Sequence, residues 1–267
     1  MTKPILDIQH ISKSFHSKTT GNNYVLKDFN LTIPTNKITA LIGGNGTGKT
    51  TLFNIISRLV PADKTITKKI LFQGKNLLKQ QPNNLASLGI GRLFQDAHIF
   101  PNLSILDNMC VASDTSFGEN PFDSLLFTKK SKKTEKTKTA KAIQILSDLF
   151  TNESIFVQNP NLLAGKLSYG QQRLLGLARL SMGNYSLILL DEPTAGVHTQ
   201  LNDKIAEIVV LLKKQGKTIF LIEHNMAFVR KIADYVAFMA NHNIFIQGEP
   251  NDVLNNKQVQ QHYLGIL

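Results

Sequence analysis

Residues 38–50 read ITALIGGNGTGKT, and this stretch decides the fold. The mostly apolar run 38–42 is typical of a buried strand. Residues 43–50 then fit the pattern G-x-x-x-x-G-K-[ST], and residues 49–59 continue with the apolar spacing of a helix. A strand, a glycine-rich turn and a helix in this order predict a phosphate-binding loop within an α/β domain.

Each part of this loop has a chemical purpose. Glycines let the backbone wrap closely around phosphates, and the positive N-terminal end of the helix faces the same anions. We expect the Lys49 ammonium to neutralise the β- and γ-phosphates and the Thr50 hydroxyl to ligate Mg²⁺, which prefers oxygen. The residues predicted to hold the nucleotide here are Gly43, Gly44, Asn45, Gly46, Thr47, Gly48, Lys49, Thr50 and Thr51. The loop alone predicts a binder of nucleoside triphosphates and leaves the reaction open.

A second chemical signal stands at the end of another apolar strand. Residues 187–192 read LILLDE, which has the form of a Walker B strand. Asp191 can hold Mg²⁺ there, directly or through water. Glu192 is placed to polarise the water that attacks the γ-phosphate, and its basicity rises when the pocket closes and excludes water. Together with the phosphate loop, the pair predicts hydrolysis of the triphosphate.

The rest of the chain alternates strands with helices, which favours a parallel α/β sheet. From about 95 to 182 the spacing is mostly helical, and Ser104 before Asp107 resembles a helix N-cap. Residues 115–123 are rich in turn formers and predict a loop. The first strands predict an antiparallel β element that leads into the core. The other predicted strands are 6–8, 25–33, 218–222, 235–239 and 243–247, and the other predicted helices are 139–150, 168–182, 201–214 and 226–232.

Composition limits the class of protein. Of 267 residues, 42% are hydrophobic and 18% are charged, which is typical of a globular chain. The single cysteine excludes a disulfide framework, so a reducing cytosol is expected. No run reaches the ~18 apolar residues of a membrane span, and the N-terminus lacks the apolar region of a signal peptide. Any membrane role is therefore expected to come through a partner.

The formal net charge is +11, a sign that suits nucleic acid or an anionic membrane surface. One basic run supplies much of it: Lys129, Lys130, Lys132, Lys133, Lys136, Lys138 and Lys141. A solvated helical face, lipid headgroups and nucleic acid all fit this run. No aromatic residue is interleaved with the lysines, which argues against binding of single strands.

Residues 167–172, LSYGQQ, resemble the LSGGQ signature of ATP-binding-cassette (ABC) proteins, with Tyr169 in the first glycine place. The other motifs of that family stand in its order along nearly the whole chain. Phe15 matches the aromatic A-loop position, and Gln95 closes GRLFQ like the Q-loop glutamine. His224 looks like the switch histidine that follows the last core strand.

This resemblance implies an ABC nucleotide-binding domain, a RecA-like P-loop NTPase core with an antiparallel β element and an inserted α-helical subdomain. Residues 1–267 would form one such domain, with its core at about 1–92 and 183–267 and the helical subdomain at about 93–182. It also implies an ATPase that uses ATP and Mg²⁺ and works as a dimer. Each ATP would lie between the phosphate loop of one subunit and the signature helix of the other.

The roles that the family implies can be carried over residue by residue. The expected catalytic residues are Glu192, His224, Lys49 and Gln95, and the expected Mg²⁺ ligands are Thr50, Gln95 and Asp191. Phe15 is expected to stack on adenine. Ser168, Gly170 and Gln171 are expected to reach nucleotide on the other subunit, because they open a helix with N–H donors. His198 stands where the family's D-loop usually ends in Asp or Asn, which is a departure at the expected dimer contact.

Within the family, the details look most like the ATPase of branched-chain amino acid importers and their amide or urea relatives. The stretches that carry this likeness are GRLFQDAHIFPNLSILDNM, LSYGQQRLLGLAR, DEPTAGV and LIEHNMAFV. The likeness implies a second cassette, integral membrane permeases and an external solute-binding protein as partners. The chain would be peripheral, at the cytoplasmic face of the plasma membrane.

Two alternatives stay open. One is the motor of an exporter for lipid, peptide or polysaccharide. The other is a soluble cassette protein that acts on ribosomes or DNA, which the positive charge would suit. Such proteins usually carry two cassettes or a long coiled coil, and this sequence has neither, so a nucleic-acid partner is not expected.

Overall fold

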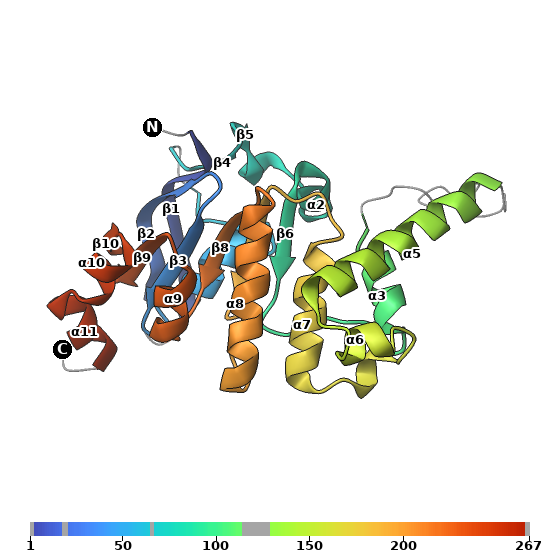
Figure 1. The fold of residues 1–267 in the computed structure, drawn as a ribbon. Helices are drawn as coiled ribbons and strands as arrows, with labels where there is room; N and C mark the ends of the chain where they lie inside the picture. The colour runs from blue at the N-terminus through green and yellow to red at the C-terminus, as the bar shows by residue number, and fades with distance from the viewer. Residues whose placement is uncertain (1–2, 18–20, 65–66, 114–128, 265–267) are drawn as a thin grey trace. The chain divides into compact units, whose positions relative to one another are not determined.

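A computed structural model describes residues 3–17, 21–64, 67–113 and 129–264. The chain divides into two compact units (Figure 1). The first comprises Met1–Gln95, Tyr185–Ala195 and Val209–Leu267, and the second comprises Asp96–Asn184 and Gly196–Ile208. The division falls inside helix α8 (Thr199–Lys214). The predicted loop 115–123 lies outside the described residues.

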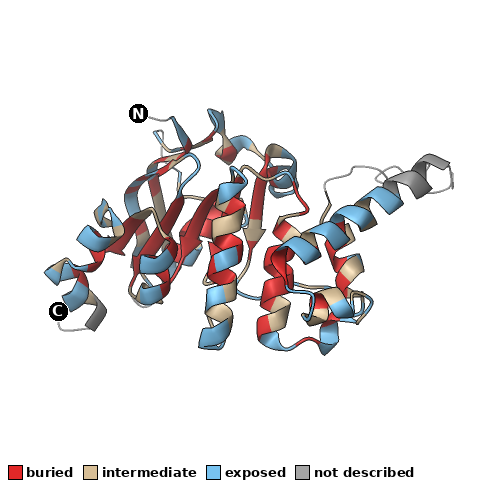
Figure 2. Cartoon of the chain, in the orientation of Figure 1, coloured by how far each residue is buried: buried red, intermediate tan, exposed pale blue. Residues whose placement is uncertain are grey.

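A six-stranded sheet in the order β10-β9-β3-β8-β7-β6 forms the centre of the first unit. Its strands are β3 (Ile38–Gly43), β6 (Ile90–Leu93), β7 (Leu187–Asp191), β8 (Thr218–Ile222), β9 (Tyr235–Ala240) and β10 (Asn243–Gly248). Neighbours from β9 to β6 pair in parallel, and β10 at the edge pairs antiparallel with β9. Every residue of β3, β7 and β8 is buried (Figure 2), which is why their sequences are apolar runs without alternation. The predicted parallel α/β sheet is confirmed.

The same unit contains a four-stranded antiparallel sheet in the order β2-β1-β4-β5. Its strands are β1 (Pro4–Ser17), β2 (Gly21–Pro34), β4 (Lys69–Phe72) and β5 (Lys75–Asn76). This is the predicted antiparallel element, but β1 and β2 extend well beyond the predicted 6–8 and 25–33. Register shifts along β1, for example between Ile8 and Ile11, interrupt the alternation that a sequence pattern detects.

One hydrophobic core joins both sheets to helix α1 (Lys49–Ile56). The rings of Phe53 in α1 and Phe220 in β8 pack with their centroids 4.9 Å apart. The helix ends three residues before the predicted end at 59, and Arg58 has a left-handed φ of 60°. Because α1 packs through its buried face in this core, its N-terminus is held beside the end of β3.

Short elements complete the first unit. They are α2 (Leu85–Leu88), α9 (Met226–Ile232), α10 (Pro250–Leu254), α11 (Lys257–Leu264) and the 3₁₀ turns η1 (Leu77–Lys79) and η2 (Pro82–Asn84). None of the helices in the described ranges has the length and hydropathy of a membrane span.

The second unit is helical, as predicted for the middle of the chain. Its elements are α3 (Ile105–Val111), α5 (Lys129–Leu149), α6 (Ile155–Gln158), η3 (Ala164–Lys166), α7 (Tyr169–Leu180) and the start of α8. Ser104 caps α3, since the Asp107 N–H donates to its Oγ at 2.9 Å. Helix α5 begins ten residues before the predicted 139, through a lysine-rich segment of good helix propensity. The side chains of residues 129–134 lie outside the described part, so the interpretations of the basic run stay predictions.

Candidate functional site

The turn between β3 and α1 has a backbone that its glycines permit. Gly46 and Gly48 have φ of 75° and 105°, in the left-handed region that favours glycine. A Cβ on Gly48 would lie 2.7 Å from Val25 Cγ1, so a larger residue has no room there. In the described structure no side chain caps α1 at Gly48, which leaves the first N–H groups of the helix to a ligand.

Lys49 lies at the base of this turn with only 5% of its surface exposed. Its Nζ donates hydrogen bonds to the carbonyl oxygens of Gly43 at 2.9 Å and Gly44 at 2.7 Å. Burial lowers the pKa of Lys49, and the nearby carboxylates of Glu192 and Asp191 oppose that shift. An ammonium held in this way is poorly solvated, and a phosphate oxygen would be a stronger acceptor than either carbonyl.

A cavity of about 260 Å³ opens over the loop. The residues that line it are Val25, Asn45, Gly46, Gly48, Lys49, Thr50, Thr51, Glu192 and His224. Most of the predicted phosphate-loop residues therefore share one cavity with three of the four predicted catalytic residues, which are Lys49, Glu192 and His224. Phe15 is not among the residues that line it. Phe15 is 49% exposed on β1, and the Nζ of Lys13 lies 4.9 Å from the centroid of its ring.

Three parallel strands deliver the acidic and basic groups to this cavity. Because β3, β8 and β7 are neighbours in the sheet, their carboxyl ends meet at one edge. The Oε1 of Glu192 lies 2.9 Å from His224 Nε2, and the Gln95 side-chain amide donates to Glu192 Oε2 at 3.4 Å. Glu192 has a φ of 47°, a strained conformation of the kind that concentrates at functional sites. The structure thus brings together three residues that the sequence placed on separate motifs.

Arg92 was missed by the sequence reasoning, and it contacts a predicted metal ligand. Its Nη2 donates to Asp191 Oδ2 at 3.0 Å, and both side chains are nearly inaccessible to solvent. Its Nη1 donates to Ser57 Oγ at 2.9 Å, and the guanidinium carbon Cζ lies 4.3 Å from the centre of the Phe94 ring. Burial lowers the pKa of Arg92, and Asp191 opposes the shift. The sequence did contain a signal for this contact, since Arg92 is a charged residue within the otherwise uncharged strand 90–93. A buried charge needs a counter-charge, so a partner such as Asp191 could have been expected.

A buried acid at the end of β8 was also missed. Glu223 is 2% exposed. Its Oε1 accepts hydrogen bonds from the N–H and the Oγ1 of Thr194, at 2.9 and 2.6 Å. Its Oε2 accepts from the N–H groups of His224 and Asn225, at 2.9 and 3.0 Å. The signal was an acid directly after an apolar strand, the same pattern that singled out residues 187–192.

In the second unit, the LSYGQ segment begins helix α7. The Ser168 Oγ accepts from the Gln171 N–H at 3.3 Å, and the Ser168 N–H donates to Gln171 Oε1 at 2.9 Å, which forms a capping box. A Cβ on Gly170 would lie 2.5 Å from Leu201 Cδ1, so this glycine permits close packing against α8. Tyr169 is 46% exposed beside them. Gln171 therefore has a structural contact within its own helix.

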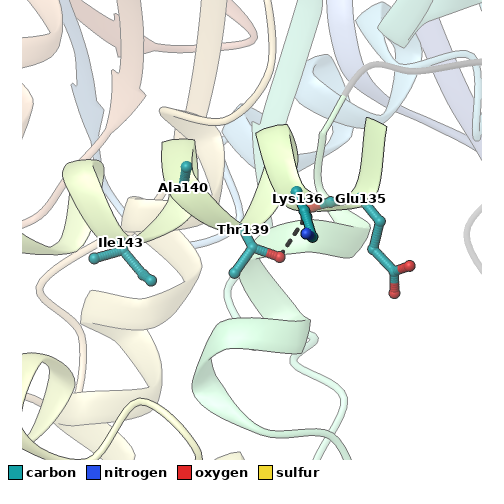
Figure 3. A pocket seen from close by; sticks show the side chains of 5 residues that line it. All are labelled: Glu135, Lys136, Thr139, Ala140 and Ile143. Carbon is teal, nitrogen blue, oxygen red and sulfur yellow. Dashed lines mark hydrogen bonds between the residues drawn. The ribbon is translucent and has the colours of Figure 1, made fainter. Parts of the chain in front are cut away.

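A second hollow, of about 550 Å³, lies along α5. Its lining residues are Glu135, Lys136, Thr139, Ala140 and Ile143 (Figure 3). The Thr139 hydroxyl donates to the carbonyl oxygen of Glu135 at 3.0 Å, a contact within the helix. The five residues include no glycine, so they offer no closely approaching backbone amides for a phosphate.

The groups near the loop suit a hard cation that also binds phosphate. Thr50, Asp191 and Gln95 offer hydroxyl, carboxylate and amide oxygens, the donor type that Mg²⁺ prefers. Within the described ranges, no group of three or more His, Cys, Asp or Glu side chains could hold a metal ion. A cation here would need phosphate oxygens to complete its coordination, as Mg²⁺ does in many nucleotide sites.

The fold and this geometry define the class of the protein, a P-loop nucleotide-binding protein of the α/β type. Residues 26–195 match the family described as ABC transporter. The chain is 34% identical over 261 residues to a probable branched-chain amino acid transport ATP-binding protein LivG of Archaeoglobus fulgidus, across 98% of this chain and 95% of that protein. It is 28% identical over 266 residues to the high-affinity branched-chain amino acid transport ATP-binding protein LivG of Escherichia coli K12, across 99% of each.

Solved structures agree with the sequence comparison. A nucleotide-free ATP-binding cassette from an ABC transporter is 30% identical, with a TM-score of 0.78 over 98% of this chain and 99% of that one. A dimeric cassette bound to ADP and phosphate is 20% identical, with a TM-score of 0.71 over 92% and 98%, and shows the fold alone. The chain belongs to the ABC transporter family and is an ATPase subunit of that family.

Proposed function

We propose that this ABC ATPase subunit drives the import of branched-chain amino acids or related small solutes. The nearly full-length likeness to relatives named as branched-chain amino acid transport ATP-binding proteins supports this cargo. The proposed partners are a second cassette, identical or related, permease subunits in the membrane, and an external solute-binding protein. The chain would be peripheral at the cytoplasmic face of that membrane.

Binding of ATP rests on the phosphate loop. The phosphates lie among the N–H groups of the loop and of the α1 N-terminus, and Lys49 transfers its hydrogen bonds from carbonyl oxygens to phosphate oxygens. Phe15 offers an exposed ring on which adenine stacks. Bound Mg²⁺ supplies charge neutralisation at the β- and γ-phosphates, and Thr50, Asp191 and Gln95 are the residues that would hold it.

Hydrolysis rests on Glu192, and its 2.9 Å contact with His224 at the cavity is the observation that carries the proposal. The carboxylate takes a proton from a water molecule whose oxygen attacks the γ-phosphorus. The bond from that phosphorus to the β–γ bridging oxygen breaks, leaving ADP and inorganic phosphate. His224 and Gln95 hold the carboxylate in the orientation this step needs.

Dimerisation completes the site. The N-terminal end of α7, opened by Ser168, offers N–H donors and the positive end of a helix to an anion. In the proposed dimer this end faces the γ-phosphate held by the other subunit. ATP then draws the subunits together, and loss of the γ-phosphate lets them separate.

The Glu192→Gln variant tests the catalytic assignment. We expect kcat for ATP hydrolysis to fall at least 100-fold, because the amide cannot accept the proton. We also expect an ATP-dependent dimer that persists, because nucleotide binding is unaffected while turnover stops. ATPase assays and light scattering after gel filtration measure the two effects. Turnover at the wild-type rate would refute the role of Glu192.

Uptake assays test the cargo. In a strain that lacks this gene, we expect import of leucine, isoleucine or valine to fall, and the wild-type gene but not its Glu192→Gln variant to restore it. Normal import of these solutes together with loss of an export phenotype would favour an exporter motor. A protein that stays away from membranes when coexpressed with its permeases, and co-sediments with ribosomes, would contradict the transport proposal.

A further inference from the structure

Glu223 holds together two loops that carry different parts of the proposed site. One loop follows β7, where Thr194 lies two residues after Glu192. The other follows β8, where His224 is the next residue after Glu223 itself. The carboxylate joins them, since one oxygen accepts two hydrogen bonds from the first loop and the other accepts two from the second.

The burial of Glu223 excludes direct contact with nucleotide. The residue is 2% exposed and is not among the residues that line the cavity over the phosphate loop. A buried carboxylate is costly unless donors surround it, and here four donors do so. A carboxylate side chain therefore occupies a buried position where an apolar side chain would avoid the cost of desolvation.

We infer that Glu223 is a positioning residue that sets the distance between Glu192 and His224. This inference rests on the proposed function, in which Glu192 takes a proton from the attacking water and His224 orients the Glu192 carboxylate. Glu192 Oε1 lies 2.9 Å from His224 Nε2. The two loops that carry these side chains are joined nearby by the hydrogen bonds to Glu223. The Glu192 N–H also donates to the Ile222 carbonyl oxygen at 3.0 Å, so the two loops stay joined where they begin. Without the clamp, the residues beyond that bond can shift relative to one another, and a displacement of about 1 Å can cost about 100-fold in rate.

The chemistry of the four contacts explains why a carboxylate is needed. All four partners are N–H or O–H donors, and only an ionised carboxylate accepts on both oxygens without offering a hydrogen in return. Glutamine has the same length, but its amide group must face one pair of donors. The two hydrogen bonds to that pair of donors would be lost, and the glutamine NH₂ group would face other hydrogen-bond donors.

The Glu223→Gln variant tests the inference. We expect kcat for ATP hydrolysis to fall about 10- to 100-fold, as for other residues that orient catalytic groups. The KM for ATP should stay within about threefold, because the phosphate loop is unchanged. In a His224→Ala background the same substitution should add less than about threefold, since the pair it positions is already broken. A purely structural role would lower stability and leave kcat per folded molecule unchanged in both backgrounds.

Matched variants keep the test decisive if Glu223→Gln folds poorly. Thr194→Val removes one donor to Glu223 and keeps the shape, whereas Thr194→Ser keeps the hydroxyl. We expect Thr194→Val to lower kcat severalfold and Thr194→Ser to retain most of it. Glu207→Gln, at a side chain that is 65% exposed on α8, serves as the control for loss of a carboxylate.

The outcomes separate the two ideas. Full activity of Glu223→Gln and Thr194→Val, together with an inactive Glu192→Gln, overturns the inference and leaves the proposed function standing. Full activity of Glu192→Gln overturns the proposed function itself. Equal losses from Glu223→Gln in the wild-type and His224→Ala backgrounds also overturn the inference, because the effect would then not pass through the pair.

Discussion

Lys49, Arg92 and Glu223 are charged side chains that are almost fully withdrawn from water, and each has a defined partner. Lys49 donates to two carbonyl oxygens, Arg92 pairs with Asp191, and Glu223 accepts four hydrogen bonds. Burying a charge is costly, and partners offset that cost only when the geometry is good. At the scale of the residue, the site is therefore a set of charges kept in place by their partners.

The Arg92→Gln variant tests this view. Removing the counter-charge of the buried Asp191 should lower the free energy of unfolding by about 3 kcal/mol, the usual effect of breaking a buried ion pair. Arg92→Lys should cost less but still be measurable, because a lysine cannot pair with Asp191 and reach Ser57 at once. Urea unfolding without nucleotide measures both. Arg230→Gln, at an exposed arginine, is the control, and equal losses in Arg92→Gln and Arg230→Gln would contradict the prediction.

At the scale of the element, the phosphate loop depends on backbone shapes that side chains disturb. Gly46 and Gly48 both have positive φ, but their surroundings differ. A Cβ at Gly46 would meet nothing within 4 Å, whereas one at Gly48 would lie 2.7 Å from both Val25 Cγ1 and the Val25 carbonyl oxygen. Conformational strain acts at both positions, and steric overlap with β2 acts at Gly48 alone.

Alanine at these two glycines should therefore have unequal effects. Gly46→Ala should cost about 1 kcal/mol of stability, from the left-handed backbone. Gly48→Ala should cost about 3 kcal/mol or more, since the overlap forces α1 and β2 apart, and ATP binding should weaken with it. Thermal unfolding and nucleotide titration measure the two variants side by side. Equal destabilisation would show that strain alone matters at Gly48.

At the scale of the whole molecule, the residues predicted to contact nucleotide are divided between two compact units. The phosphate loop, Glu192 and His224 belong to the first unit, and the signature helix that begins after Ser168 belongs to the second. In the proposed function the second set serves the nucleotide of a partner subunit. Nucleotide should then bind to and stabilise a single chain through the phosphate loop, Glu192 and His224. Formation of the dimer should be a separate step that follows.

Thermal unfolding with and without ATP tests this separation. At ATP about 100-fold above its Kd, linkage predicts a gain of about 2.7 kcal/mol, or a rise in Tm of about 5–10 °C for a chain of this size. The Lys49→Ala variant should lose this rise in Tm at the same ATP concentration, because it lacks the buried ammonium that is expected to bind the phosphates. Ser168→Ala should keep most of the rise in the monomer but form less of the ATP-dependent dimer. An undiminished rise in Lys49→Ala would mean that the phosphate loop is misassigned.

The sequence by itself determined the features that lie within a short stretch of chain. The phosphate loop of residues 43–50, the buried runs of β3, β7 and β8, and the N-cap at Ser104 each depend on neighbours a few residues away. Their periodicity and residue types are therefore visible in one dimension. The parallel sheet followed from their order, and the family from the motifs together.

Only the tertiary structure decided which side chains meet. Arg92 and Asp191 are 99 residues apart in the chain, and Glu223 and Thr194 are 29 apart. These contacts depend on strand order, which places β6 and β8 on either side of β7, and no local pattern specifies that order. The sequence analysis also missed the short strands β4, β5 and β6. A strand of two to four residues carries too little periodicity to be recognised, and strand pairing depends on the tertiary structure.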